Sequence, residues 1–211
     1  MNVHIETYPS KILRQTCEDI DIKEEQMFAM NICNKMAKVI KDFEALGLAA
    51  NQLGYNKRII GIHKRGVDEP KFMLNPVISE KKGVFIGDEA CLSFPGVLVK
   101  VKRSAVITVK YFSLESDKEI EEKLMGEEAI IIQHEVDHLD GKTLVNSASG
   151  ALREKVMRQL KVGKRKFAKA MKQQARLRKL GDKLKMIDDE AGRQLAKSAL
   201  SDNNISIPEV V

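Results

Sequence analysis

Apolar residues repeat at helical spacing near both ends of the chain. Between residues 24 and 46 they fall at every third or fourth position, at Met27, Met30, Cys33, Met36, Ala37 and Ile40. This period is typical of an amphipathic helix, which we expect to end near Gly47. A second helix is predicted over residues 127–139, where an apolar run leads in and Asp140-Gly141 supplies a turn. From about residue 148 the chain becomes basic and helix-prone.

Short β-rich runs broken by Gly and Pro fill the middle of the chain. Strands are predicted over residues 58–62, 72–74, 77–79, 84–86, 97–101 and 105–112. Strands in the middle and helices at both ends, without regular alternation, indicate an α+β fold. We expect mixed or antiparallel β-sheets around the helix at 127–139, followed by a long basic helical C-terminal extension.

The composition narrows the class of protein. The chain has 211 residues, of which 43% are hydrophobic, enough for a sizeable core. Three cysteines in a chain of this length are not a disulfide framework, so a reducing compartment is expected. The first residues resemble neither a signal peptide nor a transit segment, and no apolar run approaches 18 residues. These features predict a cytoplasmic protein without a membrane partner.

Positive charge is concentrated in one segment. Residues 151–185 hold 14 Lys and Arg against 2 Asp and Glu, a net charge of +12, whereas residues 1–150 and 186–211 each carry −3. RNA phosphates attract such a surface, so docking on RNA is one interpretation. A solvated helical extension is the other, and composition does not choose between them.

The pattern with the most chemical content is His134-Glu135-Val136-Asp137-His138. Residues four apart lie on the same face of a helix, one turn apart. Two imidazoles there can bind one metal ion, and the glutamate between them can reach a water molecule beside it. The alternative is an amphipathic helix with two solvated histidines, but the apolar run before His134 favours a helix that enters the core.

A third ligand is needed, because catalytic zinc-type sites usually have three protein ligands. No histidine follows His138, and the carboxylates beyond it lie in the basic segment. Cys91 lies upstream in a turn-rich stretch at the edge of the strands, where a thiolate can be presented. A small buried hydrophobe is the usual fate of a free cysteine. With His134 and His138 in the same chain, a Cys-His-His site is plausible.

The segment 45–52 is rich in small residues that let a ligand approach the backbone closely. Gln52 at its end could donate a side-chain N–H to a developing oxyanion. An ordinary helix end followed by a loop is the competing interpretation of this segment.

Taken together, these three segments resemble peptide deformylase. That family carries G-x-G-x-A-A-x-Q, E-G-C-L-S and Q-H-E-x-x-H in this order. The chain reads A-x-G-x-A-A-x-Q at 45–52, E-A-C-L-S at 89–93 and Q-H-E-V-D-H at 133–138. Its opening Y-P-S-K-I-L-R at 8–14 is also similar, and the resemblance covers roughly residues 5–165.

The resemblance implies an enzyme that removes the formyl group from the N-terminal formyl-methionine of nascent polypeptides. It implies one divalent metal ion held by Cys91, His134 and His138, with Fe(II) expected first and Zn(II) or Ni(II) able to substitute. Glu135 takes the role of general base and later acid. Gln52 and the backbone N–H of Leu92 are the implied oxyanion donors.

Further roles follow from the same resemblance. Glu89 is expected to pair with Arg103 beside the site, and Gly47 to offer its backbone to the substrate. Residues expected to line the methionine pocket, besides His134, are Leu48, Ile86, Ile130 and Ile131. The expected organisation is a deformylase-like catalytic domain over residues 1–148, a basic helical extension over 149–200 and a polar tail over 201–211. For such an enzyme, the partner implied for residues 151–185 is the ribosome and its rRNA.

Two positions depart from the family pattern. Ala45 and Ala90 stand where the family has glycine, and a left-handed backbone at either would cost alanine roughly 1 kcal/mol. An active enzyme is the favoured interpretation because the expected ligands, Glu135 and Gln52 are present. The alternatives are a catalytically degenerate, ribosome-binding relative and an H-E-x-x-H metallopeptidase.

Overall fold

The computed structural model describes residues 4–64, 66–146 and 150–185. Its helices are α1 (Gln26–Phe43), α2 (Glu127–Leu139) and α3 (Gly150–Lys185), with two short 3-10 turns, η1 (Ile12–Arg14) and η2 (Ala50–Leu53). Its strands are β1 (Gly47–Ala49), β2 (Ile59–Ile62), β3 (Lys71–Lys82), β4 (Phe85–Glu89), β5 (Val99–Arg103), β6 (Val106–Ser113) and β7 (Lys118–Met125). The expected α+β class with antiparallel sheets is confirmed.

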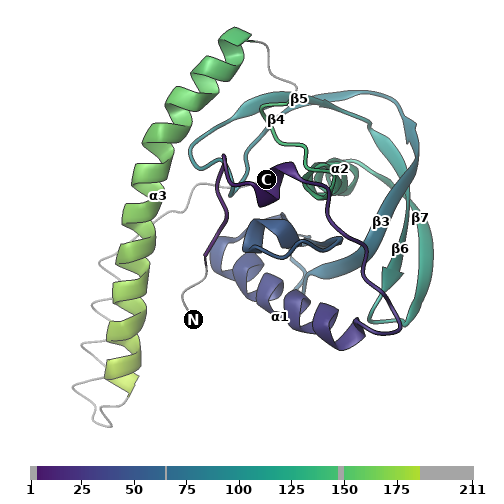
Figure 1. Ribbon diagram of the computed structural model, residues 1–211, viewed down its shortest axis with the longest axis horizontal. Coiled ribbons are helices and arrows are strands. Elements are labelled where there is room, and N and C mark those ends of the chain that lie inside the picture. The colour runs from purple at the N-terminus through teal and green to yellow at the C-terminus, as the bar shows by residue number, and fades with distance from the viewer. Residues whose placement is uncertain (1–3, 65, 147–149, 186–211) are drawn as a thin grey trace.

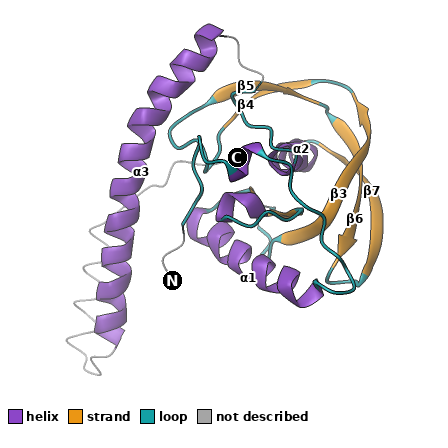
Figure 2. Cartoon of the chain, in the orientation of Figure 1, coloured by secondary structure: helices purple, strands orange, loops and turns teal. Residues whose placement is uncertain are grey.

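The strands form two antiparallel sheets. Five of them pair in the order β1-β2-β3-β6-β7, and β4 pairs with β5 in a separate ribbon. Figure 1 shows α2 nearly end-on at the centre of the fold, with the strands curving around it. In Figure 2 the strands β3, β6 and β7 lie on the side of α2 away from α3.

The two faces of the larger sheet bury different helices. Successive strand side chains point to opposite faces, so Ile59 packs in the cluster beneath α1 while Ile60 packs in the cluster beneath α2. Leu74 and Met73 divide in the same way. The sheet thus separates an α1 layer from an α2 layer, and α2 is buried on most of its surface.

The predicted helices are present, with one boundary moved. α1 ends at Phe43 rather than near residue 46, because Glu44 takes a left-handed conformation that closes the helix. Residues 47–49, expected as the end of that helix and a loop, form β1. The two runs expected at 72–74 and 77–79 are one strand, β3, whose pairing with β6 shifts register between Leu74 and Val77.

The strand β7 was not predicted. Its sequence K-E-I-E-E-K-L-M is mostly charged, and two of its apolar residues, Ile120 and Leu124, pack on the α2 cluster. β7 lies at the end of the strand order, where one edge needs no partner. An edge strand with one polar face therefore has a composition that is typical of a loop.

α3 runs along the molecule on the side away from β6 and β7 (Figure 1). Its first half is anchored by Val156 and Leu160, which are buried in a cluster with Cys91 and Phe94. No helix among the described residues is both long and apolar enough to cross a bilayer. The expected polar tail at 201–211, and residues 186–200 of the expected extension, lie outside the described residues.

The α1 layer gives a direct test of core packing. Met36 is fully buried on α1, whereas Met30 on the same helix is 45% exposed. We expect Met36→Ala to lower the free energy of unfolding by about 2–5 kcal/mol because it leaves a cavity. Met30→Ala, the matched control, should change it by no more than about 0.5 kcal/mol. Urea unfolding measures both, and equal losses would contradict this assignment of the core.

Candidate active site and metal centre

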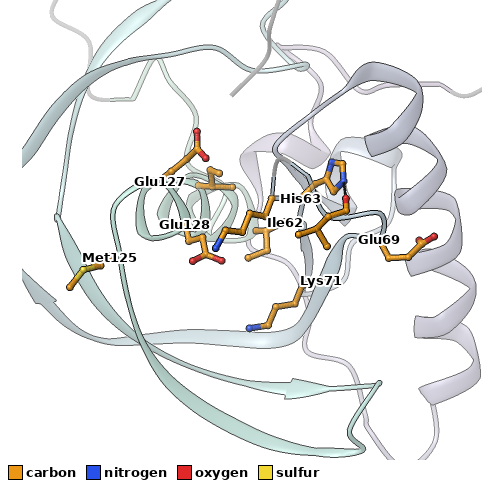
Figure 3. Close-up of a pocket in the computed structure, with 10 residues that line it drawn as sticks. Ile62, His63, Glu69, Lys71, Met125, Glu127 and Glu128 are labelled. Carbon is orange, nitrogen blue, oxygen red and sulfur yellow. Dashed lines mark hydrogen bonds between the residues drawn. The ribbon is translucent and has the colours of Figure 1, made fainter.

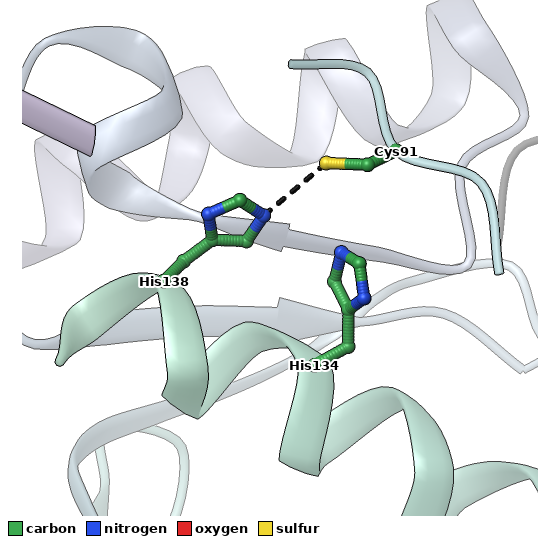
Figure 4. A group of neighbouring side chains, drawn as sticks. All are labelled: Cys91, His134 and His138. Carbon is green, nitrogen blue, oxygen red and sulfur yellow. Dashed lines mark hydrogen bonds between the residues drawn. The ribbon is translucent and has the colours of Figure 1, made fainter. Parts of the chain in front are cut away.

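Three buried side chains with metal-ligating atoms meet in the middle of the fold (Figure 4). Sγ of Cys91 and a ring nitrogen of each of His134 and His138 lie within 4.8 Å of one another. Sγ of Cys91 is 3.2 Å from Nε2 of His138. Within the described residues, this is the one group of three His, Cys, Asp or Glu side chains close enough to share an ion.

The local structure explains this convergence. His134 and His138 project from the same side of α2, one turn apart. Cys91 follows β4 in a turn that is closed by the N–H of Phe94 donating to the carbonyl of Cys91, at 2.9 Å. The other two cysteines are ordinary core residues, since burial raises the pKa of Cys17 to about 11 and that of Cys33 to about 12.

The donor set fits a divalent transition metal. Thiolate and imidazole are the ligands that zinc and iron sites use. Bond lengths of about 2.3 Å to sulfur and 2.0–2.1 Å to nitrogen put the two atoms about 3.5 Å apart in a tetrahedral site. The 3.2 Å between Cys91 and His138 is close to this value. These two atoms therefore already have nearly the separation that two ligands of one ion need.

Glu89 orients the first histidine. Its Oε2 lies 2.8 Å from Nδ1 of His134, so a proton on Nδ1 leaves the lone pair of Nε2 available for a metal. Burial lowers the pKa of His134, but contacts with Cys91 and Glu89 outweigh burial and raise it well above its ordinary value. Burial and the charge on His134 hold the pKa of His138 well below its ordinary value.

Arg103 joins Glu89 to α2. Its guanidinium donates to both oxygens of Glu89, at 2.7 and 2.9 Å, and to the carboxylate of Asp137. Burial alone would raise the pKa of Glu89, but the hydrogen bonds from Arg103 and His134 lower it to about 2. The structure thus brings together the predicted Glu89–Arg103 pair, and Glu89 stays ionised although it is only 2% exposed.

Glu135 is buried beside Cys91, His134 and His138, and its Oε2 has no hydrogen-bond partner among the described residues. Burial raises the pKa of Glu135 to about 7. Gly47 makes room for this carboxylate. A Cβ atom at residue 47 would lie 2.4 Å from Oε1 of Glu135 and 2.7 Å from Cγ2 of Ile131. The backbone of β1 therefore approaches Glu135 as closely as only glycine allows.

Gln52 is fixed by hydrogen bonds at both ends of its amide. Its oxygen accepts the N–H of Ala49 at 2.8 Å, which turns the NH₂ group toward the site. The amide nitrogen lies 3.2 Å from Oγ of Ser93 and 3.5 Å from Sγ of Cys91. Leu92, between Cys91 and Ser93, is buried in the α1 layer.

Sequence reasoning missed two supporting residues. Asn51 donates to the backbone carbonyl of His138 at 2.6 Å, which ties η2 to the end of α2. Gln133 pairs with the backbone of Ser104, accepting its N–H at 2.9 Å and donating to its carbonyl at 2.8 Å. The only signal was their position next to Gln52 and His134, which does not indicate which backbone groups they contact.

The residues expected to line the methionine pocket do not all lie in the same part of the structure. Ile130 and Ile131 lie on α2 one turn before His134, and Ile131 shares the α2 cluster with Leu46. Leu48 is instead buried beneath α1, because alternation along β1 turns it away from Gly47 and Glu135. Ile86 is 60% exposed on β4. The structure therefore does not bring Leu48 and Ile86 into one pocket with Ile131.

A cavity of about 370 Å³ lies beside Ile131, at the start of α2 (Figure 3). Its apolar lining comes from Ile62, Val67, Met125 and Ile131, and its charged rim includes Lys71, Glu127 and Glu128. The metal-ligating side chains do not line it. His134 and His138 instead line a separate crevice of about 30 Å³, next to Arg103 and Asp137.

The two alanines that replace family glycines are not strained. Neither Ala45 nor Ala90 is among the residues with a positive φ angle. Ala45 is fully buried and packs in the α1 layer. A methyl group at these positions thus requires no left-handed backbone, and the departure from the pattern removes no conformation that the site uses.

A buried thiol–imidazole group with a carboxylate beside it, on an antiparallel α+β fold, places the protein among metal-dependent hydrolases. Comparison with known proteins gives the family. Residues 3–154 match the family model described as polypeptide deformylase. The chain belongs to the peptide deformylase family.

Individual relatives agree with this assignment. A peptide deformylase of Stenotrophomonas maltophilia is 37% identical over 156 residues, covering 72% of this chain and 91% of the relative. One from Alkalilimnicola ehrlichii is 31% identical over 155 residues, covering 72% and 85%. The crystal structure of a peptide deformylase from Legionella pneumophila matches with a TM-score of 0.71 and 31% identity, covering 78% of this chain and 96% of that one.

The Glu89–Arg103 pair can be tested without metal. Arg103→Met leaves the buried Glu89 carboxylate without its cation, so we expect a loss of about 3–5 kcal/mol in the free energy of unfolding. Adding Glu89→Gln removes the unpaired charge and should restore part of the loss. Urea unfolding in the presence of a chelator measures both variants. If the double variant is no more stable than Arg103→Met, the loss does not come from an unpaired Glu89.

Proposed function

We propose that this protein uses a divalent metal ion to remove the formyl group from the N-terminal formyl-methionine of nascent polypeptides. The observation that carries the proposal is the convergence of Cys91, His134 and His138 beside the buried Glu135. Family membership supports the reaction, since peptide deformylases hydrolyse N-formylmethionyl peptides. Because its substrates emerge from ribosomes, we place its action in the cytoplasm.

Cys91, His134 and His138 would hold the metal. Fe(II) is our first proposal, with Zn(II) or Ni(II) as substitutes, because one thiolate and two imidazoles suit all three ions. When bound, the ion would polarise the formyl carbonyl and lower the pKa of a water molecule in the site. Because the third ligand is Cys91, upstream of α2, the arrangement differs from peptidases that take a third ligand downstream.

The protein groups would then divide the reaction between them. Glu135 would accept a proton from the attacking water and deliver it to the leaving amine nitrogen, so that formate and a free N-terminus are released. A carboxyl group whose pKa lies at about 7 suits both directions of transfer. The NH₂ group of Gln52 and the N–H of Leu92 would donate to the formyl oxygen as negative charge develops there.

We propose that the methionine side chain packs along α2, against Ile130 and Ile131. Gly47 would present its backbone to the substrate, since it lies against the side chains of both Ile131 and Glu135. The cavity next to Ile131 has Ile62 and Met125 in its wall and so offers the methionine side chain an apolar surface. This apolar lining can bury the unbranched thioether side chain of methionine.

Glu135 provides the sharpest test of the chemistry. Glu135→Gln keeps the shape of the side chain but removes its proton-transfer function, so we expect kcat to fall by roughly 10²- to 10⁴-fold. Metal content should stay at the wild-type level because Glu135 is not a ligand. Cys91→Ser should lose metal, whereas Cys33→Ala, the matched thiol control, should retain it. A Glu135→Gln enzyme with undiminished kcat would contradict the assigned base.

We further propose that α3 docks on the ribosome through its basic surface. This divides the chain into a catalytic domain up to about residue 148 and a basic extension from 149 onward. The exposed basic side chains of α3 include Arg153, Lys155, Arg158, Lys161, Arg165, Lys166, Lys169 and Lys172. Because rRNA is a phosphate polymer, this surface suits electrostatic attraction rather than base recognition.

Charge reversal tests the docking. Lys161, Arg165 and Lys169 are exposed and four residues apart on α3, so they share one face. Replacing all three by Glu should weaken cosedimentation with ribosomes and reduce the dependence of binding on salt by about 2–3 in log–log slope. The matched control replaces the exposed Lys81, Lys118 and Lys123, which lie on strands β3 and β7. Equal loss in both variants would mean that net charge, and not α3, governs binding.

A further inference from the structure

Gly163, in the middle of α3, lies directly on the backbone of Pro95 and Gly96, in the second of two consecutive turns that span residues 91–97. A Cβ atom at residue 163 would lie 1.7 Å from the carbonyl oxygen of Pro95 and 3.1 Å from Cα of Gly96. Gly96 is itself in the left-handed region, and its own Cβ would meet Cα of Gly163 at 3.0 Å. Two glycines therefore bring a helix and a turn together with no side chain between them.

Glycine in the interior of a helix is unfavourable compared with alanine, so its position here needs a compensating contact. The approach to Pro95 provides it, because the obstacle to a side chain is backbone and cannot rotate away. Gly150, at the start of the same helix, has no atom within 4 Å of where its Cβ would be. The close approach is thus a property of residue 163 and not of glycines in α3 generally.

The first of these two turns carries Cys91, and Phe94, its last residue, begins the second turn, which Gly163 contacts. Cys91 and Phe94 are buried in one cluster with Val156 and Leu160 of α3. On the other side, Tyr8 stacks on Phe94 with ring centroids 5.1 Å apart, and its N–H donates to the carbonyl of Ser93 at 3.0 Å.

α3 also contacts the N-terminal segment directly. Nζ of Lys164 donates to the carbonyl of Tyr8 at 2.7 Å. The two turns are therefore in contact with both the N-terminal segment and α3, and Ser93 in the first turn accepts the hydrogen bond from Gln52. Contacts run without a break from α3 to the thiol and to the amide of Gln52.

We infer that Gly163 is a positioning residue for the metal centre: by seating α3 on the Pro95–Gly96 turn, it fixes the place of Cys91. This inference rests on the proposed metal site for one of its two consequences. A side chain at 163 lifts α3 from the turn and loosens the Cys91 sulfur, which weakens metal binding. It also leaves the Cys91 thiol more open to reagents, whether or not metal binds.

The test compares Gly163→Ala with two control variants in the full chain. Gly150→Ala is the matched glycine replacement. Phe167→Leu loosens α3 elsewhere, since Phe167 stacks on Phe43 of α1 at 6.0 Å and not on the turn. Two quantities are measured: the Kd for Zn(II) by competition with a chromophoric chelator, and the alkylation rate of Cys91 in metal-free protein. Peptide mass spectrometry resolves Cys91 from Cys17 and Cys33, which serve as internal references.

We expect Gly163→Ala to raise the Kd about tenfold or more, as loss of a supporting contact does at other metal sites, and to speed alkylation of Cys91 alone. Both controls should match the wild type in both measurements. The inference is overturned if Gly163→Ala changes neither quantity, or if Phe167→Leu changes them as much. If the wild type itself binds no Zn(II), the proposed metal site fails, and the alkylation rates still decide the role of Gly163.

Discussion

The burial of charged and polar groups on α2 is the constraint on which this structure depends. A helix that lies inside a protein is normally apolar, yet α2 buries Gln133, His134, Glu135 and His138 together. Each such group costs free energy unless it finds a partner inside the protein. The chain meets this cost with Glu89 and Arg103, which hold His134, and with Ser104, which pairs with Gln133. On α2, the buried atoms that find no partner in the part of the chain that the structure describes are Oε2 of Glu135 and Nδ1 of His138, both at the site.

The rest of the fold serves to place those partners around α2. The larger sheet covers one side of the helix, and Gly47 in β1 lets its backbone reach Glu135. The separate β4–β5 ribbon delivers Glu89 and Arg103 from adjacent strands, and the turn after β4 delivers Cys91. Cys91 is thus brought to His134 and His138, which lie 43 and 47 residues further along the chain, by elements packed around α2, and a preorganised site requires such support. α3 completes it from the outside through the Pro95–Gly96 turn.

Much of the site could be predicted from sequence, because helical spacing alone puts His134 and His138 on one face of α2. The place of Cys91 needed the family resemblance, since no local pattern reveals which turn lies over a helix. Leu48 was assigned to the methionine pocket from the family resemblance, whereas strand alternation from Gly47 turns its side chain beneath α1. β7 was not predicted as a strand because most of its residues are charged and face solvent at the edge of the sheet. The contact made by Gly163 could not be predicted, because the sequence of a basic helix does not indicate which backbone a glycine in it touches.

We propose that the buried Cys-His-His group holds a metal ion on which the deformylase activity of this protein depends. The most direct measurement is anaerobic turnover of a formyl-methionyl peptide by protein loaded with Fe(II) or Ni(II), with formate release and metal content determined on the same sample. We expect one metal ion per chain and repeated release of formate, and no release after the metal is removed by a chelator. Stoichiometric metal without formate release would contradict this proposal.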